Sequence, residues 1–528
     1  MTSDSPVIQT AQVLSERYGP SYRWLVTISG MVGVVSMVLA MTTVNVAVPD
    51  VMGAFGIGQD KAQWMSSAYM ATMTAGMLIN AWLTGIFGER RVFVTALCSF
   101  SLGAILGGTA PTEDSLILAR ILQGFSAGVA QPLVMATIFT VFPPERRGSA
   151  MGVFGLGVVF APAIGPTLGG LMIEYFSWRY VFFISLPFCV IAAVLGLFFM
   201  PTRRIPREIP PFDWLGFGLL GVALLGLMTG IADGQREGWG SDTIVLRLTA
   251  GTVAAVAFVL WELHTPRAML DVRIFKNIEF SAAAMIAFIF GAGMMGSTYI
   301  IPVFVQTIIG FTPLLAGLMM MPAGIMLAFI FPVAGRLSDA FPASVMIIIG
   351  LLLFALGFAW MTLADIDTTF WTLVAMIMVS RLGLGLINPS LNASSLKALP
   401  PDKVRQGSGV ANFMRQLGGA FGINLMVAFF EVRTRFHADA LTATQSWDNK
   451  TTERLLHQVQ QLMQRSGLPF QQQKAGALEY LGAILNINAQ EMAFSDTFVV
   501  VGIVALIALV PAAMLSRSQR RARRLAFS

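Results

Sequence analysis

The chain has 528 residues, of which 55% are hydrophobic and only 12% are charged. This composition excludes a water-soluble globular domain and is typical of proteins that cross a membrane many times. The formal net charge of +6 gathers in loops between apolar segments, so nucleic-acid binding is a poor explanation for it. The two cysteines and three scattered histidines lack the spacing of a disulfide or metal site, and we expect no cofactor.

Apolar segments of spanning length recur along the whole chain. A spanning helix needs about 20 mainly apolar residues, and the sequence predicts fourteen such helices. Six lie in 24–200, two in 201–278 and six in 279–515, where a long polar stretch at 432–494 precedes the last. The predicted segments are 24–48, 62–83, 91–110, 115–139, 148–174, 178–200, 214–232, 244–263, 279–303, 313–334, 342–363, 369–394, 407–431 and 495–515.

The positions of the basic residues predict the orientation of these segments. If both termini are cytoplasmic, the N-terminal tail 1–23, the cytoplasmic loops and the basic tail 516–528 hold 21 of the 34 Lys and Arg residues. The short outer loops hold only Lys61, Arg179, Arg236 and Arg247. Cytoplasmic loops of membrane proteins carry an excess of Lys and Arg, so the sequence predicts that both termini are cytoplasmic.

An internal repeat divides the chain into two halves. The segment PPERRGSAMGV at Pro143 recurs as PPDKVRQGSGV at Pro400, and each follows an apolar segment with an arginine, Arg120 or Arg381. The offset is about 260 residues in both comparisons. The repeat predicts two similar six-helix halves separated by two inserted helices. That arrangement suits a transporter whose substrate site lies between halves that rock against each other.

Motifs along nearly the whole chain resemble those of one family, the major facilitator superfamily. Within it the chain resembles the fourteen-helix drug:proton antiporter branch that includes EmrB and QacA. The resemblance implies an all-α polytopic membrane protein with the major facilitator fold. It rests on TTVNVAVP at Thr42, WMSSAY at Trp64, LARILQG at Leu118, APAIGPTLGG at Ala161, WRYVFFISLP at Trp178, FDWLG at Phe212, GQREGW at Gly234 and RQLGGAFG at Arg415.

Two positions depart from the pattern of this branch. Members commonly carry an aspartate two residues before Thr42, where this chain has Ala40. The superfamily also expects an aspartate where Gly85 stands, although the second half keeps it as Asp339. We therefore expect a charge contact on the cytoplasmic face that depends mainly on Asp339, with Arg336 as its partner, or else a solvated loop.

Ionisable residues at membrane depth are costly and mark functional sites. Arg120 resembles the fourth-helix arginine of the family and, as a fixed cation, can lower the proton affinity of nearby carboxylates; the alternative is a structural hydrogen-bonding role. Arg415 is a second buried cation. The acidic candidates all fall near the outer ends of segments, so proton coupling is implied by the resemblance alone.

Polar residues in apolar helices need partners within the bundle, a water-filled cavity or substrate. Helix-to-helix bonding and a substrate cavity are both open for each of them. Methionine and phenylalanine supply adaptable apolar surface around them. The cavity candidates are Asn45, Tyr69, Gln123, Gln306, Asn388 and Asn412, with Asn80, Gln131, Tyr299 and Asn392 as further members.

The segment APAIGPTLGG resembles the fifth-helix motif of antiporters. Gly165 and Gly169 lie one turn apart, where small residues let a neighbouring helix approach closely. Pro162 and Pro166 share this spacing and predict a bend, and Gly170 completes the motif. We expect a tight, bent seam between the two halves, or a simple packing kink.

The outer stretch 432–494 contains two amphipathic patterns, ERLLHQVQQLMQRSG at Glu453, with Gly467 as a stop, and AGALEYLGAILNINAQEM. They predict two helices that fold back on the protein or bilayer, or dock a partner. The resemblance implies a periplasmic adaptor protein and an outer-membrane channel as partners.

Taken with the resemblance, these features predict a secondary active transporter, not an enzyme, in a bacterial cytoplasmic (inner) membrane. Its substrates would be lipophilic small molecules exported in exchange for protons. The first alternative is a dedicated exporter of an endogenous metabolite or siderophore, or a facilitator without proton coupling. A membrane-embedded receptor or enzyme is disfavoured because no catalytic cluster or nucleotide loop is present in the sequence.

Overall fold

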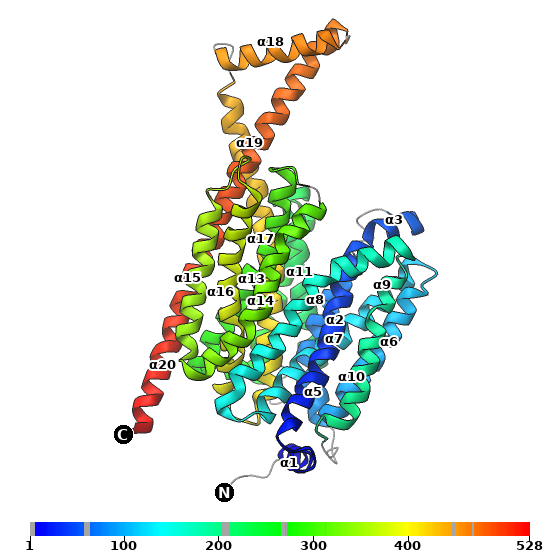
Figure 1. The fold of residues 1–528 in the computed structure, drawn as a ribbon, viewed down its shortest axis with the longest axis vertical. Coiled ribbons are helices and arrows are strands. Elements are labelled where there is room, and N and C mark those ends of the chain that lie inside the picture. The colour runs from blue at the N-terminus through cyan, green and yellow to red at the C-terminus, as the bar shows by residue number, and fades with distance from the viewer. Residues whose placement is uncertain are drawn as a thin grey trace.

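The computed structural model describes residues 6–57, 64–202, 211–265, 270, 272–311, 313–445, 449–466 and 469–527. The regular elements of this described part are helices (Figure 1). Thirteen of them are long and apolar enough to cross a membrane. The remaining predicted segment, 148–174, forms the 29-residue helix α8. The prediction of an all-α polytopic membrane fold is confirmed.

The first half contains six long helices. Short helices α1 (Pro6–Tyr18), α3 (Val48–Phe55) and α9 (Tyr180–Phe183) flank them. The long helices are α2 (Tyr22–Val46), α5 (Trp64–Phe87), α6 (Glu89–Gly108), α7 (Glu113–Val141), α8 (Arg147–Tyr175) and α10 (Ser185–Phe199).

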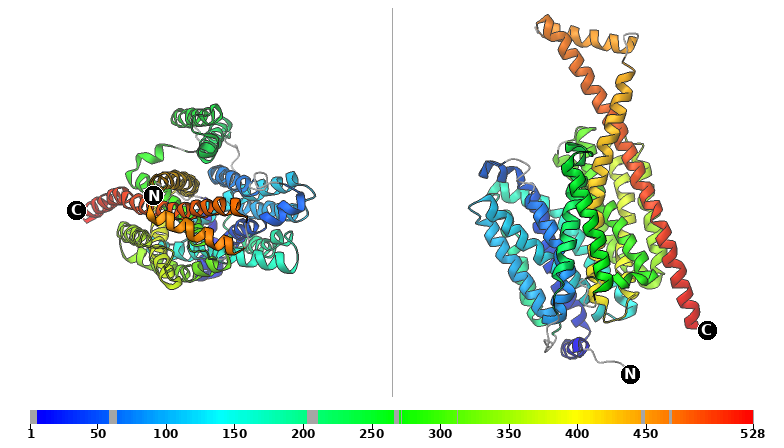
Figure 2. Two further views of the ribbon diagram at one scale, coloured as in Figure 1. Left: turned by 90° about the horizontal axis from the view of Figure 1, so that it is seen from above. Right: turned by 180° about the vertical axis from the view of Figure 1, so that it is seen from behind.

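Two inserted helices, α11 (Trp214–Glu237) and α12 (Asp242–His264), precede the second half and lie to one side of the bundle (Figure 2). A salt bridge of 2.6 Å between Arg247 and Asp233 joins them. The helices of the second half are α13 (Ile278–Thr307), α14 (Pro313–Ala340), α15 (Ala343–Met361), α16 (Phe370–Lys397), α17 (Val404–Ala443), α18 (Lys450–Arg465), α19 (Phe470–Ile507) and α20 (Leu509–Phe527).

Within each half, glycines allow the backbones of neighbouring helices to touch. A Cβ atom added at Gly128 of α7 would lie 2.0 Å from the Met73 carbonyl oxygen of α5. In the second half, a Cβ at Gly418 of α17 would lie 1.9 Å from the Phe288 carbonyl oxygen of α13. Close approach of this kind supplies the packing energy that apolar surface alone does not supply inside a lipid bilayer.

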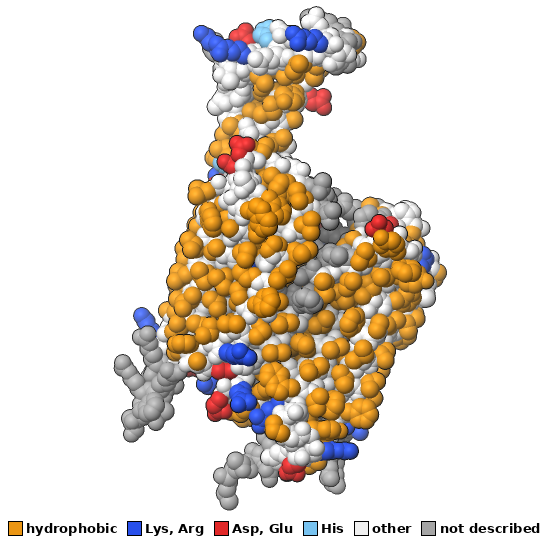
Figure 3. Space-filling model, in the orientation of Figure 1, with side chains coloured by type: hydrophobic (Ala, Val, Ile, Leu, Met, Phe, Trp, Pro, Cys, Tyr) orange, Lys and Arg blue, Asp and Glu red, His pale blue; other side chains and the backbone are white. Residues whose placement is uncertain are grey.

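The two halves meet at the end of the bundle where α1 and the end of α20 lie, which we call the terminal end (Figure 1). Here the start of α8 packs on the end of α14: a Cβ at Gly152 would lie 2.4 Å from the Phe331 carbonyl oxygen. The start of α17 packs on α5, where a Cβ at Gly409 would lie 2.7 Å from the Met77 carbonyl oxygen. Toward the opposite end the halves diverge, and a notch separates their apolar outer surfaces (Figure 3).

The opposite end carries a helical projection, which we call the arm: the end of α17, α18 and the start of α19 (Figure 2). Helix α17 is 40 residues long and α19 is 38 residues long, so both continue past the bundle. The prediction of a helix at Glu453 is confirmed by α18, whereas the second amphipathic pattern is not a separate helix but the start of α19. Gly467, the predicted stop, lies outside the described residues.

Candidate functional site

Arg120 of α7 lies in the interior of the first half with 0% of its surface exposed. Its Nε donates to the Met65 carbonyl of α5 (3.0 Å), and its Nη1 donates to Gln123 (3.0 Å) and to the Ala40 carbonyl of α2 (3.5 Å). The guanidinium carbon lies 4.2 Å from the centre of the Tyr69 ring, whose hydroxyl donates to the Met37 carbonyl. Arg120 and Tyr69 are therefore buried and hydrogen-bonded inside the first half, and their predicted roles in coupling and in a substrate cavity stay predictions.

The described partners of Arg120 are all neutral. Ala40, one of the two departures from the pattern that the sequence resembles, offers only its backbone carbonyl. Nη2 of Arg120 and Nε2 of Gln123 are buried without a hydrogen-bond partner among the described residues. A buried cation without a counter-ion is costly, which makes this arginine a functional candidate rather than a stabilising one.

The second half repeats this arrangement. Arg381 of α16, 5% exposed, donates from Nη1 to Ser297 of α13 at 2.8 Å. Arg120 and Arg381 thus each contact the first long helix of their own half. Arg415 of α17 donates from Nη2 to Oδ1 of Asn412 at 2.5 Å.

Asp339 joins the halves at the terminal end. Its carboxylate accepts hydrogen bonds from the backbone N–H groups of Gly148 (2.7 Å) and Ser149 (2.9 Å) and from the Ser149 hydroxyl (2.5 Å). A carboxylate at a helix N-terminus is favoured because the first N–H groups have no partner within the helix. The described contacts of Asp339 do not include Arg336, whose side chain is exposed, so the predicted partner is wrong.

The matching contact on the other seam uses different residues. Gly85, where the pattern expects an aspartate, has no atom within 4 Å of an added Cβ. Instead, Glu89 at the start of α6 forms a 3.2 Å ion pair with Arg405 at the start of α17, and the Glu89 side chain is only 7% exposed. Sequence analysis missed this pair, although Glu89 adjoins the departure at Gly85 and Arg405 lies inside the repeated segment.

The fifth-helix motif does not form the seam between the halves. The backbone is helical through Pro162 and Pro166. A Cβ at Gly165 would lie 2.1 Å from Oγ1 of Thr42, and one at Gly169 would lie 3.0 Å from the Thr43 carbonyl oxygen. Both neighbours belong to α2 of the same half, so the predicted role is wrong for these two glycines. An added Cβ at Gly170 would meet nothing within 4 Å. The seam is formed nearer the start of α8, by Gly148 and Gly152.

The polar cavity candidates separate into distinct environments. Gln131 and Tyr69 line a small cavity of the first half together with Val34, Met37, Val38, Met41, Met73 and Ala127. Asn388 and Asn392 bond each other at 2.8 Å within α16. Gln306 is exposed and donates to the Pro302 carbonyl of its own helix, which does not support a role in an enclosed cavity. The side chain of Asn45 lies outside the described part of the chain.

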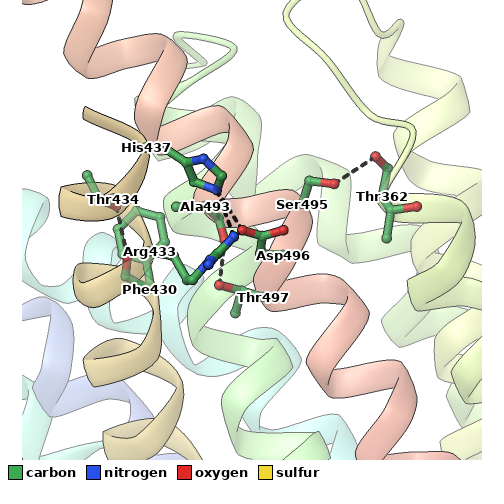
Figure 4. Close-up of polar contacts among 9 residues, drawn as sticks. All are labelled: Thr362, Phe430, Arg433, Thr434, His437, Ala493, Ser495, Asp496 and Thr497. Atoms are coloured by element: carbon green, nitrogen blue, oxygen red, sulfur yellow. Dashed lines mark hydrogen bonds and ion pairs between the residues drawn. The ribbon is translucent and has the colours of Figure 1, made fainter. Parts of the chain in front are cut away.

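A charged cluster fixes the base of the arm (Figure 4). Asp496 of α19 accepts hydrogen bonds from Arg433 Nε and contacts His437 Nε2, both at 2.6 Å and both from α17. Ser495, next to Asp496, donates to the Thr362 carbonyl at 3.2 Å. The cluster therefore holds the two long helices together where they leave the bundle.

Separating the Glu89–Arg405 pair is expected to destabilise the closed terminal end. Either Glu89→Gln or Arg405→Gln leaves the other charge unpaired, at a cost of about 1–3 kcal/mol for a partly buried pair. The double variant should lose less than the sum of the single variants. Thermal unfolding of the purified protein in nanodiscs measures the loss of stability in each variant, and the exposed Arg336→Gln serves as control. Additive losses would contradict the pairing.

Known proteins match the chain in sequence over most of its length. The family model described as Major Facilitator Superfamily matches residues 30–423. The "Uncharacterized MFS-type transporter YhcA" of Bacillus subtilis is 30% identical over 469 residues, which cover 89% of this chain and 88% of that protein. The "Multidrug export protein EmrB" of Haemophilus influenzae is 27% identical and covers 83% of this chain and 86% of that protein.

The fold is also found among solved structures. The crystal structure of the human organic anion transporter MFSD10 superposes with a TM-score of 0.60 at 13% identity, covering 92% of this chain and 99% of that one. At this identity the likeness concerns the fold alone. With two halves that meet through α8, α14, α17 and α5 and a family model that spans most of both halves, the chain belongs to the major facilitator superfamily of membrane transporters.

Proposed function

We propose that the chain exports hydrophobic or amphipathic compounds across the bacterial cytoplasmic membrane by alternating access, with protons as the coupling ion. The observation that carries this proposal is the contact between the halves at the terminal end together with their divergence at the arm end (Figure 1). With the terminal end in the cytoplasm, as the basic loops indicate, this state is closed toward the cytoplasm. Similarity to a multidrug export protein supports the direction of transport and the class of substrate.

Proton coupling needs a group that gains and loses a proton during the cycle. Arg120 supplies a fixed charge beside the Ala40 carbonyl. Asp339 is a carboxylate whose hydrogen bonds must break when the terminal end opens. We therefore place the coupling role on these two residues, while a facilitator or dedicated exporter without coupling stays the alternative.

Efflux from proteoliposomes tests the proposal. A panel of lipophilic cations, anions and neutral drugs should leave the vesicles faster when a pH gradient is imposed. Arg120→Ala should reduce efflux by about 100-fold or more, because it empties a buried, hydrogen-bonded site, whereas the exposed Arg336→Gln should stay within twofold.

Efflux rates that do not change with the imposed pH gradient would contradict proton antiport. Transport of one compound alone would favour the dedicated exporter. Near-normal efflux by an Arg120→Ala protein would contradict the role of that residue.

We infer further that the arm binds a periplasmic adaptor protein that leads to an outer-membrane channel. The arm extends well away from the bundle (Figure 3). One face of α18 carries Lys450, Glu453, Arg454 and His457, and Leu462, elsewhere on the same helix, is exposed. Exposed apolar side chains beside charged ones are typical of protein-binding surfaces.

Changing the arm alone separates transport from partner binding. Replacing Leu462 by Glu and reversing the charges of Lys450 and Arg454 should leave efflux from proteoliposomes within twofold. The same variant should lose the resistance that the wild-type protein gives to cells with an outer membrane. Full resistance with the altered arm would contradict the adaptor proposal.

A further inference from the structure

Arg415 continues the surface of α17 that faces the first half. Ser408 donates to the Pro132 carbonyl of α7 at 2.6 Å, and Asn412 Nδ2 lies 3.1 Å from the Met135 sulfur of the same helix. Residues four and seven positions apart lie on one face of a helix. Arg415 therefore follows Ser408 and Asn412 on this face, one turn farther from the closed terminal end.

The charge of Arg415 has no counter-ion among the described residues. Its described side-chain partner is the neutral amide oxygen of Asn412, and the side chain is half-buried. A guanidinium has five N–H donors, so most of its hydrogen-bonding capacity is unused by that contact. A partly desolvated cation of this kind attracts an anion from outside the protein.

The facing helix offers apolar surface next to this cation. Gln131 of α7 lies one turn from Met135, toward the arm end. It lines the methionine-rich cavity with Met37, Met41 and Met73, and its buried Oε1 has no hydrogen-bond partner among the described residues. Methionine side chains adapt to apolar ligands of different shapes. The neighbourhood thus combines a cation, an unpaired buried amide and adaptable apolar walls.

We infer that Arg415 and the methionine-rich surface of the first half around Gln131 together bind organic anions with an apolar body. The guanidinium of Arg415 would hold a carboxylate or sulfonate, and the methionines would contact the apolar part. A lipophilic cation would instead meet the uncompensated charge of Arg415. The inference rests on the proposed export function, because it names the class of compound that the same site takes.

Three probes of equal chain length test the inference: octanesulfonate, octyltrimethylammonium and octanol. Binding is measured on the full chain in nanodiscs by isothermal titration. Octanesulfonate should bind about tenfold or more tightly than octyltrimethylammonium, because its charge-assisted hydrogen bond to the guanidinium is stronger than a neutral one. The ranking of the three probes is measured on the wild-type protein. It therefore tests the inference even if a substituted protein fails to fold.

Substitutions of Arg415 then test whether its charge holds the sulfonate. Arg415→Gln should weaken octanesulfonate binding about tenfold and change octanol binding less than twofold, and Arg415→Lys should restore part of the loss. Arg435→Gln removes an exposed arginine from the same helix and serves as the matched control. Equal or tighter binding of octyltrimethylammonium by the wild type, or unchanged octanesulfonate binding by Arg415→Gln, would overturn the inference.

The two proposals fail in different ways. If the protein exports neutral or cationic drugs but does not bind octanesulfonate, the anion-site inference is wrong and the export proposal still stands. If the protein binds octanesulfonate but exports no compound, the export proposal is wrong and the anion-site inference still stands.

Discussion

The carboxylate of Asp339 on the N-terminus of α8 is the contact on which the observed state depends. It is a hydrogen-bonded contact between the halves, and it uses N–H groups that α8 itself leaves unpaired. The carboxylate reaches them because Gly148 and Gly335 bring the two backbones together: a Cβ at Gly335 would lie 2.5 Å from the Gly148 carbonyl oxygen. Side chains at these positions would separate the helices and the charge would lose its partners. Closure of the terminal end is thus a matter of backbone proximity as much as of charge.

The two seams of the pseudo-symmetric protein close by different chemistry. One uses a carboxylate on a helix terminus, and the other uses the Glu89–Arg405 ion pair. A helix terminus has a fixed position, whereas an ion pair between two side chains tolerates movement of either helix. The two seams therefore differ in how much movement of their helices each contact tolerates. The buried arginines lie inside the halves and move with them.

Hydropathy, the repeat and the motifs predicted the class, the helices and the division into halves, because each depends on composition or on spacing along one segment. The contacts between segments were harder to predict. The motif at Gly165 was assigned to the seam between the halves, but Gly165 packs on Thr42 of its own half. The prediction failed because small residues indicate that some helix approaches closely and do not indicate which one. Arg336 was assigned to Asp339, although the described contacts of that carboxylate come from the start of α8 in the other half. Two of the three donors to Asp339 are backbone N–H groups, which no residue type reveals.

Distances between α8 and α14, measured at the terminal end and at the arm end, test alternating access most directly. Spin labels at Glu145 and Arg336 report the terminal end, and labels at Gly170 and Gly317 report the arm end; none of the four sites is buried. In lipid nanodiscs the substrate-free protein should give a short terminal distance and a long arm distance. Adding an exported compound, or Asp339→Asn, should lengthen the first and shorten the second. Two distances that change together, or a terminal distance that never changes, would contradict alternating access around this seam.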